Sequence, residues 1–445
     1  MTTIDGRYPV PDSDGPGSNT DKPQRAGRPM LDVARVLVLV GALSIVAVGF
    51  LAGSMGILTS ALGPADARLT MITLSVSFMA LTTGLGSALA WQAIQAMQGR
   101  SSGPFRARRA WVLGLFFLLA VFTGNMLLQL DLLPALTFPP MHVLAGILPP
   151  LTIVALVGHT LGGISRWRDV VLQISSGAFL STFLAFFLES TILLSLLISI
   201  LVIVALQPGG LEGIQRLVDQ LQDPSWQQSP VDAGDLFKSP IFVALIFLAF
   251  AGIVPLIEEA VKTIGLGLMA YRRPGLAEAM LWGVAGGAGF GLAEGLFNSA
   301  GGLDAWAPIV LLRVGASLLH CFTGALMGLA WYAALARRRW IWALGLYAAS
   351  VGVHGLWNAL TATMALLSLG ATGSQATGLE QIRANVGAIT AGGLLVLLAL
   401  LVGLGLVGLV RYVRQRDTAL NGPSPGPGTP TSSTSLAAGS PGEGA

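Results

Sequence analysis

The chain has 445 residues, of which 53% are hydrophobic and only 11% are charged, and its mean hydropathy is +0.72. Soluble domains carry about 25% charged residues, so too few remain here to coat a water-facing surface. The composition excludes a soluble globular protein and predicts an all-α, multi-pass protein of the cell membrane. The formal net charge of +3 says little about partners other than the lipid bilayer, and we expect no nucleic acid among them.

Both ends of the chain have the composition of disordered tails. Residues 1–30 are polar and rich in Gly, Pro and Asp, and residues 417–445 are dominated by Pro, Gly, Ser and Thr. Segments of this kind bury too little apolar surface to offset the entropy of folding. We therefore expect a disordered tail on each side of the membrane-embedded part.

Long apolar runs predict a bundle of about ten transmembrane helices, because a helix of about 20 residues crosses a bilayer. The expected spans are 32–57, 70–96, 109–130, 141–162, 171–206, 239–271, 276–302, 306–336, 340–368 and 386–412. Five spans of unassigned role thus occupy residues 31–207, four occupy residues 239–368, and the last is 386–412. Basic residues concentrate in the tails and in alternate loops, which predicts that both termini are cytoplasmic.

The one sizeable loop on the outer side is expected at residues 208–238. Its apolar residues recur at helical spacing, which predicts an amphipathic helix lying on the outer leaflet: Leu211, Ile214, Leu217, Val218 and Leu221. Two interpretations stay open, an ordinary surface helix and a helix that helps to admit substrate.

The stretch from Ile253 to Lys262 places two carboxylates and an ammonium group in an otherwise apolar run. Charges at bilayer depth are costly, so such residues usually serve function. Glu258 and Lys262 are four residues apart on one helix face, and we expect them to pair and hold the helix in place. Adjacent side chains diverge by about 100°, so one carboxylate faces the reacting centre. We favour Glu259 as the base that activates water, with Glu258 as the alternative.

Three further ionisable residues lie at a similar depth on the next three spans: Glu294, His320 and His354. The expected topology brings them within roughly 10 Å of Glu259 along the membrane normal. Asn298 and Asn358 each lie four residues after a member of this set and are expected to support it. The glycine-rich run from 283 to 291 should let neighbouring helices approach closely.

Two carboxylate sources and two imidazoles match the ligands of a zinc hydrolase. Glu294, His320 and His354 would hold the divalent metal, with Glu258 or Glu259 as general base. The single cysteine, Cys321, excludes a cysteine-based metal site. A metal-free version also stays open, in which Glu and His activate water while His354 and Asn358 stabilise the oxyanion.

Three other polar residues of the spans are expected to lie outside the catalytic group: Glu189, Arg313 and His142. For Glu189, an ion pair with Arg313 and a neutral carboxyl group in a polar pocket both stay open. His142 lies near one end of the fourth span and is expected at the membrane interface.

The order of these motifs resembles the PrsW family of intramembrane proteases, which is similar to the wider CAAX-protease and bacteriocin-immunity superfamily. The motifs are Glu258-Glu259-x-x-Lys262, Gly289-Phe290-x-x-x-Glu294, His320-x-x-x-Gly324 and His354-Gly355-Leu356-Trp357-Asn358. The resemblance covers residues 239–368, a four-span catalytic core. It implies a metal-dependent peptidase whose substrates are membrane-anchored regulatory proteins such as anti-sigma factors.

The sequence therefore predicts an intramembrane endopeptidase that hydrolyses peptide bonds of membrane-anchored proteins with Glu-activated water. The alternative is a proton-coupled transporter in which the same buried Glu and His residues relay protons. Transporters often contain internal repeats, and no convincing repeat relates the first five spans to the last five.

Overall fold

The structure is a computed structural model that describes residues 28–206, 240–371 and 378–421, together with residues 211, 212, 215, 218 and 219. No β-strand occurs among these residues. The helices are α1 (Arg28–Leu62), α2 (Ala65–Met97), α3 (Ala110–Gln129), α4 (Pro134–Thr160), α5 (Trp167–Ser175), η2 (Ser176–Ser181), α6 (Thr182–Ala205), α9 (Pro240–Phe247), η4 (Leu248–Ile253), α10 (Val254–Val261), α11 (Ile264–Leu268), η5 (Ala270–Arg272), α12 (Leu276–Asn298), η6 (Leu303–Ala305), α13 (Trp306–Trp331), η7 (Tyr332–Ala336), α14 (Trp340–Ala371) and α15 (Gly378–Asn421).

The helices form a polytopic membrane bundle, as the composition predicts. Nine helical stretches in the described part are long and apolar enough to cross a bilayer. The ninth expected span, 340–368, lies within α14, a 32-residue helix that is not among these nine stretches. Its apolar run is interrupted by polar residues, including His354 and Asn358. The cytoplasmic position of both termini stays a prediction.

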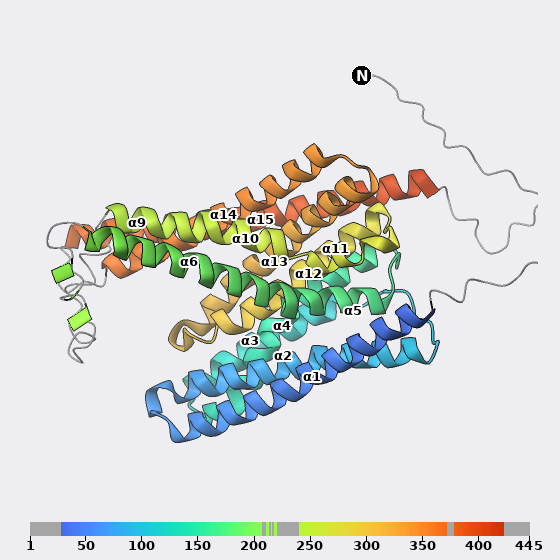
Figure 1. Ribbon diagram of the computed structural model, residues 1–445. Helices are drawn as coiled ribbons and strands as arrows, with labels where there is room; N and C mark the ends of the chain where they lie inside the picture. Colours follow the sequence, from blue (N-terminus) through green and yellow to red (C-terminus); the bar gives the residue numbers. More distant parts are fainter. Residues whose placement is uncertain are drawn as a thin grey trace, which may run out of the picture.

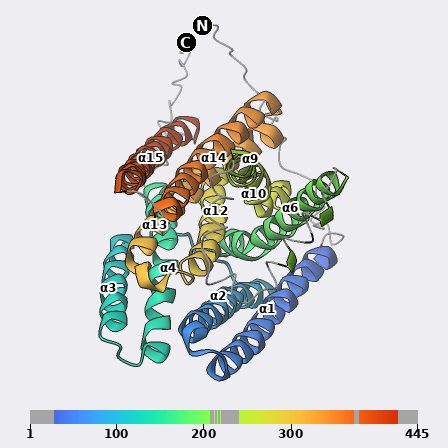
Figure 2. The same ribbon diagram turned by 90° about the vertical axis from the view of Figure 1, so that its left-hand side faces the viewer.

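Helix α12 forms the axis of the bundle. It lies at the centre of the end view, between α4, α13 and α14 (Figure 2). Of the most apolar 18-residue segment of this helix, 89% is buried, against 11% for the corresponding 18-residue segment of the helical stretch Trp167–Ser199. Glycine and alanine make this possible, because small side chains let neighbouring backbones approach closely. Helix α6 runs along the side of the bundle instead (Figure 1).

The sixth expected span, 239–271, is not one continuous helix. Helix α9 leads through the π-helical turn η4 into α10, which ends at Val261, and a turn at residues 262–263 precedes the short α11. Pro255 stands in the first turn of α10 and has no backbone N–H to donate to η4. The break follows directly after the carboxylate pair, so Glu258 and Glu259 lie in the last turns of a helix and not at mid-helix.

Several expected boundaries are also revised. Helix α15 begins at Gly378 and continues to Asn421, well beyond the expected span 386–412 and into the segment expected as the C-terminal tail. Helix α1 likewise begins at Arg28. The remainder of both expected tails lies outside the described residues, as does most of the loop 208–238 with its expected amphipathic helix.

Candidate active site

The two adjacent carboxylates of α10 have different surroundings. Glu258 lines a large cavity, whereas Glu259 is fully buried behind it. Glu259 Oε1 forms an ion pair with Lys262 Nζ. The expected pairing of Lys262 with Glu258 is therefore wrong. Lys262 lies just past the end of α10 and turns inward, with its ammonium 3.5 Å from Thr323 Oγ1 and 5.1 Å from the centre of the Phe290 ring.

His354 of α14 contacts both carboxylates with its two ring nitrogens. Its Nδ1 lies 2.8 Å from Glu259 Oε1, and its Nε2 lies 3.6 Å from Glu258 Oε2. The ring of His320, from α13, meets that of His354 edge to face at a centroid distance of 5.3 Å. Both histidines are buried, with 2% and 3% of their surfaces exposed. The two imidazoles thus meet at the wall of the cavity that contains Glu258.

Glu258, His320 and His354 have the geometry of a metal-binding group. One ligand-type atom of each lies within 4.8 Å of those of the other two. Glu258 Oε2 is buried and has no hydrogen-bond partner among the described residues. Two nitrogens and a carboxylate oxygen are the donors of many catalytic zinc sites. The residues present therefore fit a divalent metal such as zinc.

Glu294 of α12 approaches this group from the other side. Its Oε2 lies 2.6 Å from His320 Nε2 and 3.0 Å from Arg313 Nη2. Asn298 donates a hydrogen bond of 3.0 Å to Glu294 Oε1, as its spacing predicts. Arg313 thus pairs with Glu294, and the ion pair that we considered between Arg313 and Glu189 is not formed.

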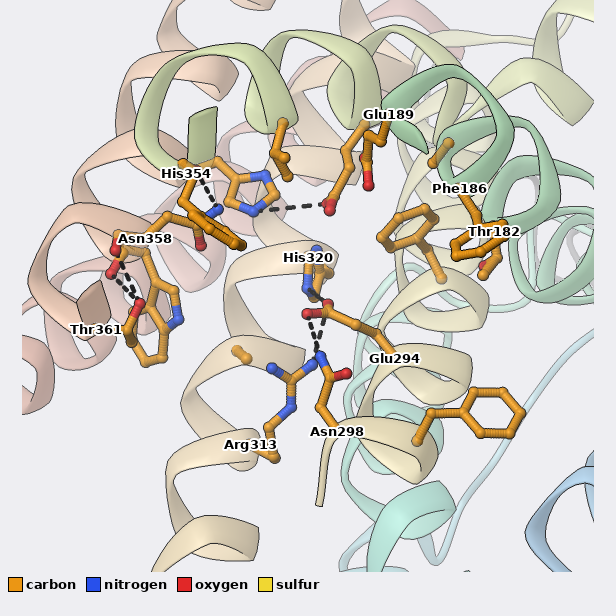
Figure 3. Close-up of a pocket in the computed structure, with 18 of the residues that line it drawn as sticks. Thr182, Phe186, Glu189, Glu294, Asn298, Arg313, His320, His354, Asn358 and Thr361 are labelled. Atoms are coloured by element: carbon orange, nitrogen blue, oxygen red, sulfur yellow. Dashed lines mark hydrogen bonds and ion pairs between the residues drawn. The ribbon is translucent and has the colours of Figure 1, made fainter. Parts of the chain in front are cut away.

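The cavity has a volume of about 1160 Å³ and its wall is mostly apolar. Figure 3 shows His320 and Glu294 near its centre, with His354 and Asn358 to one side. Phe183 and Phe186 of α6 line it although 65% and 69% of their surfaces are exposed, so this wall is open to the surroundings of the bundle. An opening at α6 would face lipid in a membrane.

Close backbone approach fixes the position of α13 against α12. A Cβ atom placed on Gly287 would lie 2.0 Å from the carbonyl oxygen of His320, and one on Gly283 would lie 2.1 Å from that of Gly324. The expectation that the glycine-rich run permits close helix contact is confirmed. These glycines set the distance between Glu294 on α12 and His320 on α13.

Residues 226–378 match the family model described as PrsW family intramembrane metalloprotease. The match spans about a third of the chain and contains all eight predicted site residues. No curated protein and no solved structure matches the chain. The PrsW match supports a membrane peptidase function and membrane-protein substrates in the bilayer. The relation to the wider CAAX-protease superfamily stays a prediction.

Within the PrsW match, Asn358 is engaged in structure. Its Nδ2 donates a hydrogen bond of 2.9 Å to the carbonyl oxygen of Phe250, in the π-helical turn η4. Tyr347 similarly donates a hydrogen bond of 2.7 Å to the carbonyl of Leu256. Both bonds fasten α14 to the irregular segment around Pro255. Asn358 is thus a supporting residue, and its Nδ2 is occupied in the resting site.

Sequence reasoning missed two features of this region. Arg313 was considered only as a partner of Glu189, although an arginine inside an apolar span is itself a signal of function. His142 was expected at the membrane interface, and this is wrong because it is fully buried. Its Nε2 lies 3.0 Å from the Leu296 carbonyl oxygen, and its Nδ1 accepts a hydrogen bond of 2.9 Å from Trp306 Nε1. The extension of α4 back to Pro134 draws His142 into the bundle.

Proposed function

We propose that this chain is an intramembrane endopeptidase that hydrolyses peptide bonds of membrane-anchored proteins. The observation that carries the proposal is the convergence of Glu258, His320 and His354, from α10, α13 and α14, on one cavity within the membrane-spanning bundle. The PrsW match over the same residues supports it. Because a buried ionisable group is costly in a membrane, three such groups meeting at one cavity favour chemistry over packing.

The proposed roles follow the contacts of each residue. Glu258, His320 and His354 would hold the divalent metal, for which zinc suits the nitrogen and oxygen donors. A bound zinc ion would supply Lewis-acid polarisation of the scissile carbonyl and lower the pKa of water. Glu294 lies beside this group, in contact with His320, and is not itself one of the three proposed ligands. It would take a proton from the attacking water and return it to the leaving nitrogen as the carbon–nitrogen bond breaks.

This assignment changes the roles that we expected from the sequence for Glu259 and Glu294. Glu259 was favoured as the base, but its Oε1 is already committed to Lys262 and His354. Glu294 was expected as a ligand, and its contacts with Arg313 and Asn298 suit an oriented general base. Glu259 would then hold the His354 ring in place, since histidine ligands commonly donate their second N–H to a carboxylate.

The substrate class follows from the location of the cavity. A peptide that reaches Glu258 must enter among the transmembrane helices, so the substrate would be a membrane-anchored protein. The family resemblance adds regulatory proteins such as anti-sigma factors as candidates. Comparing membrane proteomes of cells that make the wild-type protein or Glu258→Gln would identify the substrate, as a full-length protein that accumulates in the variant.

Reconstitution tests the activity itself. Purified protein in liposomes should cleave a co-reconstituted single-span substrate, and Glu258→Gln or His354→Ala should abolish cleavage while the protein stays folded. Thr191→Val, on the exposed face of α6, is the matched control and should cleave normally. Retained cleavage in both site variants would overturn the proposal. Proton flux in the absence of any cleavage would favour the transporter alternative.

A further inference from the structure

Two ionisable groups of the cavity take no part in the proposed proton transfer. Glu189 of α6 lines the cavity, and its Oε1 is buried without a hydrogen-bond partner in the described part of the chain. Arg313 of α13 lines the same cavity, and its Nε and Nη2 likewise have no hydrogen-bond partner there. The contact between Arg313 Nη2 and Glu294 Oε2 is an ion pair at 3.0 Å, which leaves donor capacity on the guanidinium.

The hydroxyl and amide side chains of the cavity wall have hydrogen bonds within the protein. Thr182 donates to the Gly177 carbonyl at 3.0 Å, and Thr361 donates to the Trp357 carbonyl at 3.2 Å. Asn298 and Asn358 are engaged with Glu294 and with the Phe250 carbonyl. Glu189 therefore offers a spare acceptor and Arg313 offers spare donors.

The two groups lie on opposite sides of the reactive residues. In the view of Figure 3, Glu189 lies above the His320–Glu294 contact and Arg313 lies below it. The chain of contacts from Arg313 to Glu294 to His320 measures 3.0 Å and 2.6 Å, so the guanidinium is one side chain away from the reactive group. A peptide that extends across the cavity would meet one of the two groups at each end.

A substrate in this cavity needs such groups. A transmembrane helix must unwind locally before one of its peptide bonds can be attacked, and unwinding frees backbone N–H and C=O groups in an apolar site. Each such group costs several kcal/mol if it stays unsatisfied in the absence of water. A cavity that accepts an unwound segment must therefore provide at least one acceptor and one donor.

We propose that Glu189 and Arg313 bind the main chain of the unwound substrate on either side of the scissile bond. Arg313 donates to the scissile carbonyl oxygen, and Glu189 accepts the N–H of a neighbouring residue. This inference rests on the proposed endopeptidase function. As water adds to the carbonyl carbon, the oxygen gains negative charge, and the guanidinium stabilises it more strongly than in the ground state. Arg313 is thereby a further catalytic residue, and Glu189 is a substrate-binding residue.

Variant kinetics give the first test. Arg313→Ala should lower kcat about 100-fold with little change in KM, as loss of one oxyanion donor does elsewhere. Glu189→Ala should raise KM about 10-fold, whereas Glu189→Gln, which keeps an acceptor oxygen, should stay within about threefold of the wild type. The controls are Arg383→Ala, an exposed arginine of α15, and Thr191→Val, both expected to match the wild type. Normal kinetics in the Ala variants at both positions would overturn the inference.

A change in the substrate separates direct binding from a structural role of Glu189. Replacing single peptide bonds near the scissile bond by esters removes one N–H at a time. One such ester should raise KM of the wild type about 10-fold and leave that of Glu189→Ala nearly unchanged, because the two changes remove the same hydrogen bond. Equal ester effects in both proteins would show that Glu189 accepts no N–H from the substrate.

A tetrahedral analogue separates direct contact of Arg313 from an effect through Glu294. A phosphinate peptide should bind Glu294→Gln about 100-fold more tightly than it binds the double variant Glu294→Gln/Arg313→Ala. Equal binding would mean that Arg313 acts only by orienting Glu294. If the wild type itself failed to cleave, the endopeptidase assignment would fail instead, and the two failures are thus distinguishable.

Discussion

His354 Nδ1 lies 2.8 Å from Glu259 Oε1, and neither residue has more than 3% of its surface exposed. The contact occupies one ring nitrogen and directs the other toward Glu258 and the cavity. Carboxylate–histidine pairs of this kind fix the tautomer and the orientation of a metal ligand. Glu259 is fully buried, whereas Glu258 lines the cavity. In our proposal Glu258 therefore holds the metal, and Glu259 supports the site through His354.

Glu259→Gln should weaken metal binding without abolishing it. The amide keeps the shape of the carboxylate but donates or accepts a weaker hydrogen bond, and loss of such a partner typically lowers metal affinity about 10–100-fold. Competition with a chromogenic zinc chelator would measure the affinity of the purified protein. Tyr347→Phe is the control, because it breaks a hydrogen bond to the same helix without touching His354. An unchanged zinc affinity in Glu259→Gln would contradict the supporting role.

Removing one partner of the Glu259–Lys262 ion pair should destabilise the protein strongly. Both side chains are fully buried, and an unpaired buried charge costs about 3–5 kcal/mol. Glu259→Met should therefore lower the thermal unfolding temperature in detergent, and Glu259→Met/Lys262→Met should recover most of the loss. The double variant should nevertheless stay inactive, because His354 loses its partner. If the double variant were no more stable than Glu259→Met, the loss of stability would not come from the unpaired charge of Lys262.

Metal content distinguishes the ligand set favoured by the geometry from the one proposed from the sequence. Glu258→Gln and His320→Ala should each lose bound zinc, whereas Glu294→Gln should keep it and lose cleavage. The reason is that Glu258 belongs to the close group with the two histidines, whereas Glu294 is paired with Arg313. Elemental analysis of the purified variants would measure zinc per protein. Zinc retained in Glu258→Gln but lost in Glu294→Gln would restore Glu294 as the ligand.

The sequence predicts the membrane class and the residues that meet in the cavity, because burial of charge in a bilayer is costly enough to mark them. It does not predict how neighbouring carboxylates divide their contacts. The i, i+4 rule paired Lys262 with Glu258, but that rule assumes an exposed, continuous helix. Here α10 ends at Val261, and Lys262 turns toward Glu259 and Thr323. His142 shows the same limit, since its hydrogen bonds come from helices more than 150 residues later in the chain.

Gly287→Ala should impair the site even though Gly287 carries no functional group. The added Cβ would lie 2.0 Å from the His320 carbonyl oxygen, a backbone atom that moves only if α13 moves. A displacement of about 1 Å at a catalytic group costs about 100-fold in rate. Gly345→Ala is the matched control, because nothing lies within 4 Å of a Cβ placed there. Cleavage rates and unfolding temperatures of both variants would test this, and equal activity would contradict the close packing of α12 on α13.

Cysteine labelling tests the expected topology, because the chain contains a single cysteine, Cys321, and it is fully buried. Ser101→Cys should react only with reagents that reach the cytoplasmic side, since its loop contains Arg100 and Arg106, and basic loops are expected on the cytoplasmic side. Gly301→Cys, in an exposed loop between α12 and α13, should react with impermeant maleimide added outside intact cells. The protein without an added cysteine gives the background labelling, which would come from Cys321 alone. Labelling of Ser101→Cys from outside would invert the topology, and labelling of both positions from the same side would contradict the odd number of crossings that we expect between them.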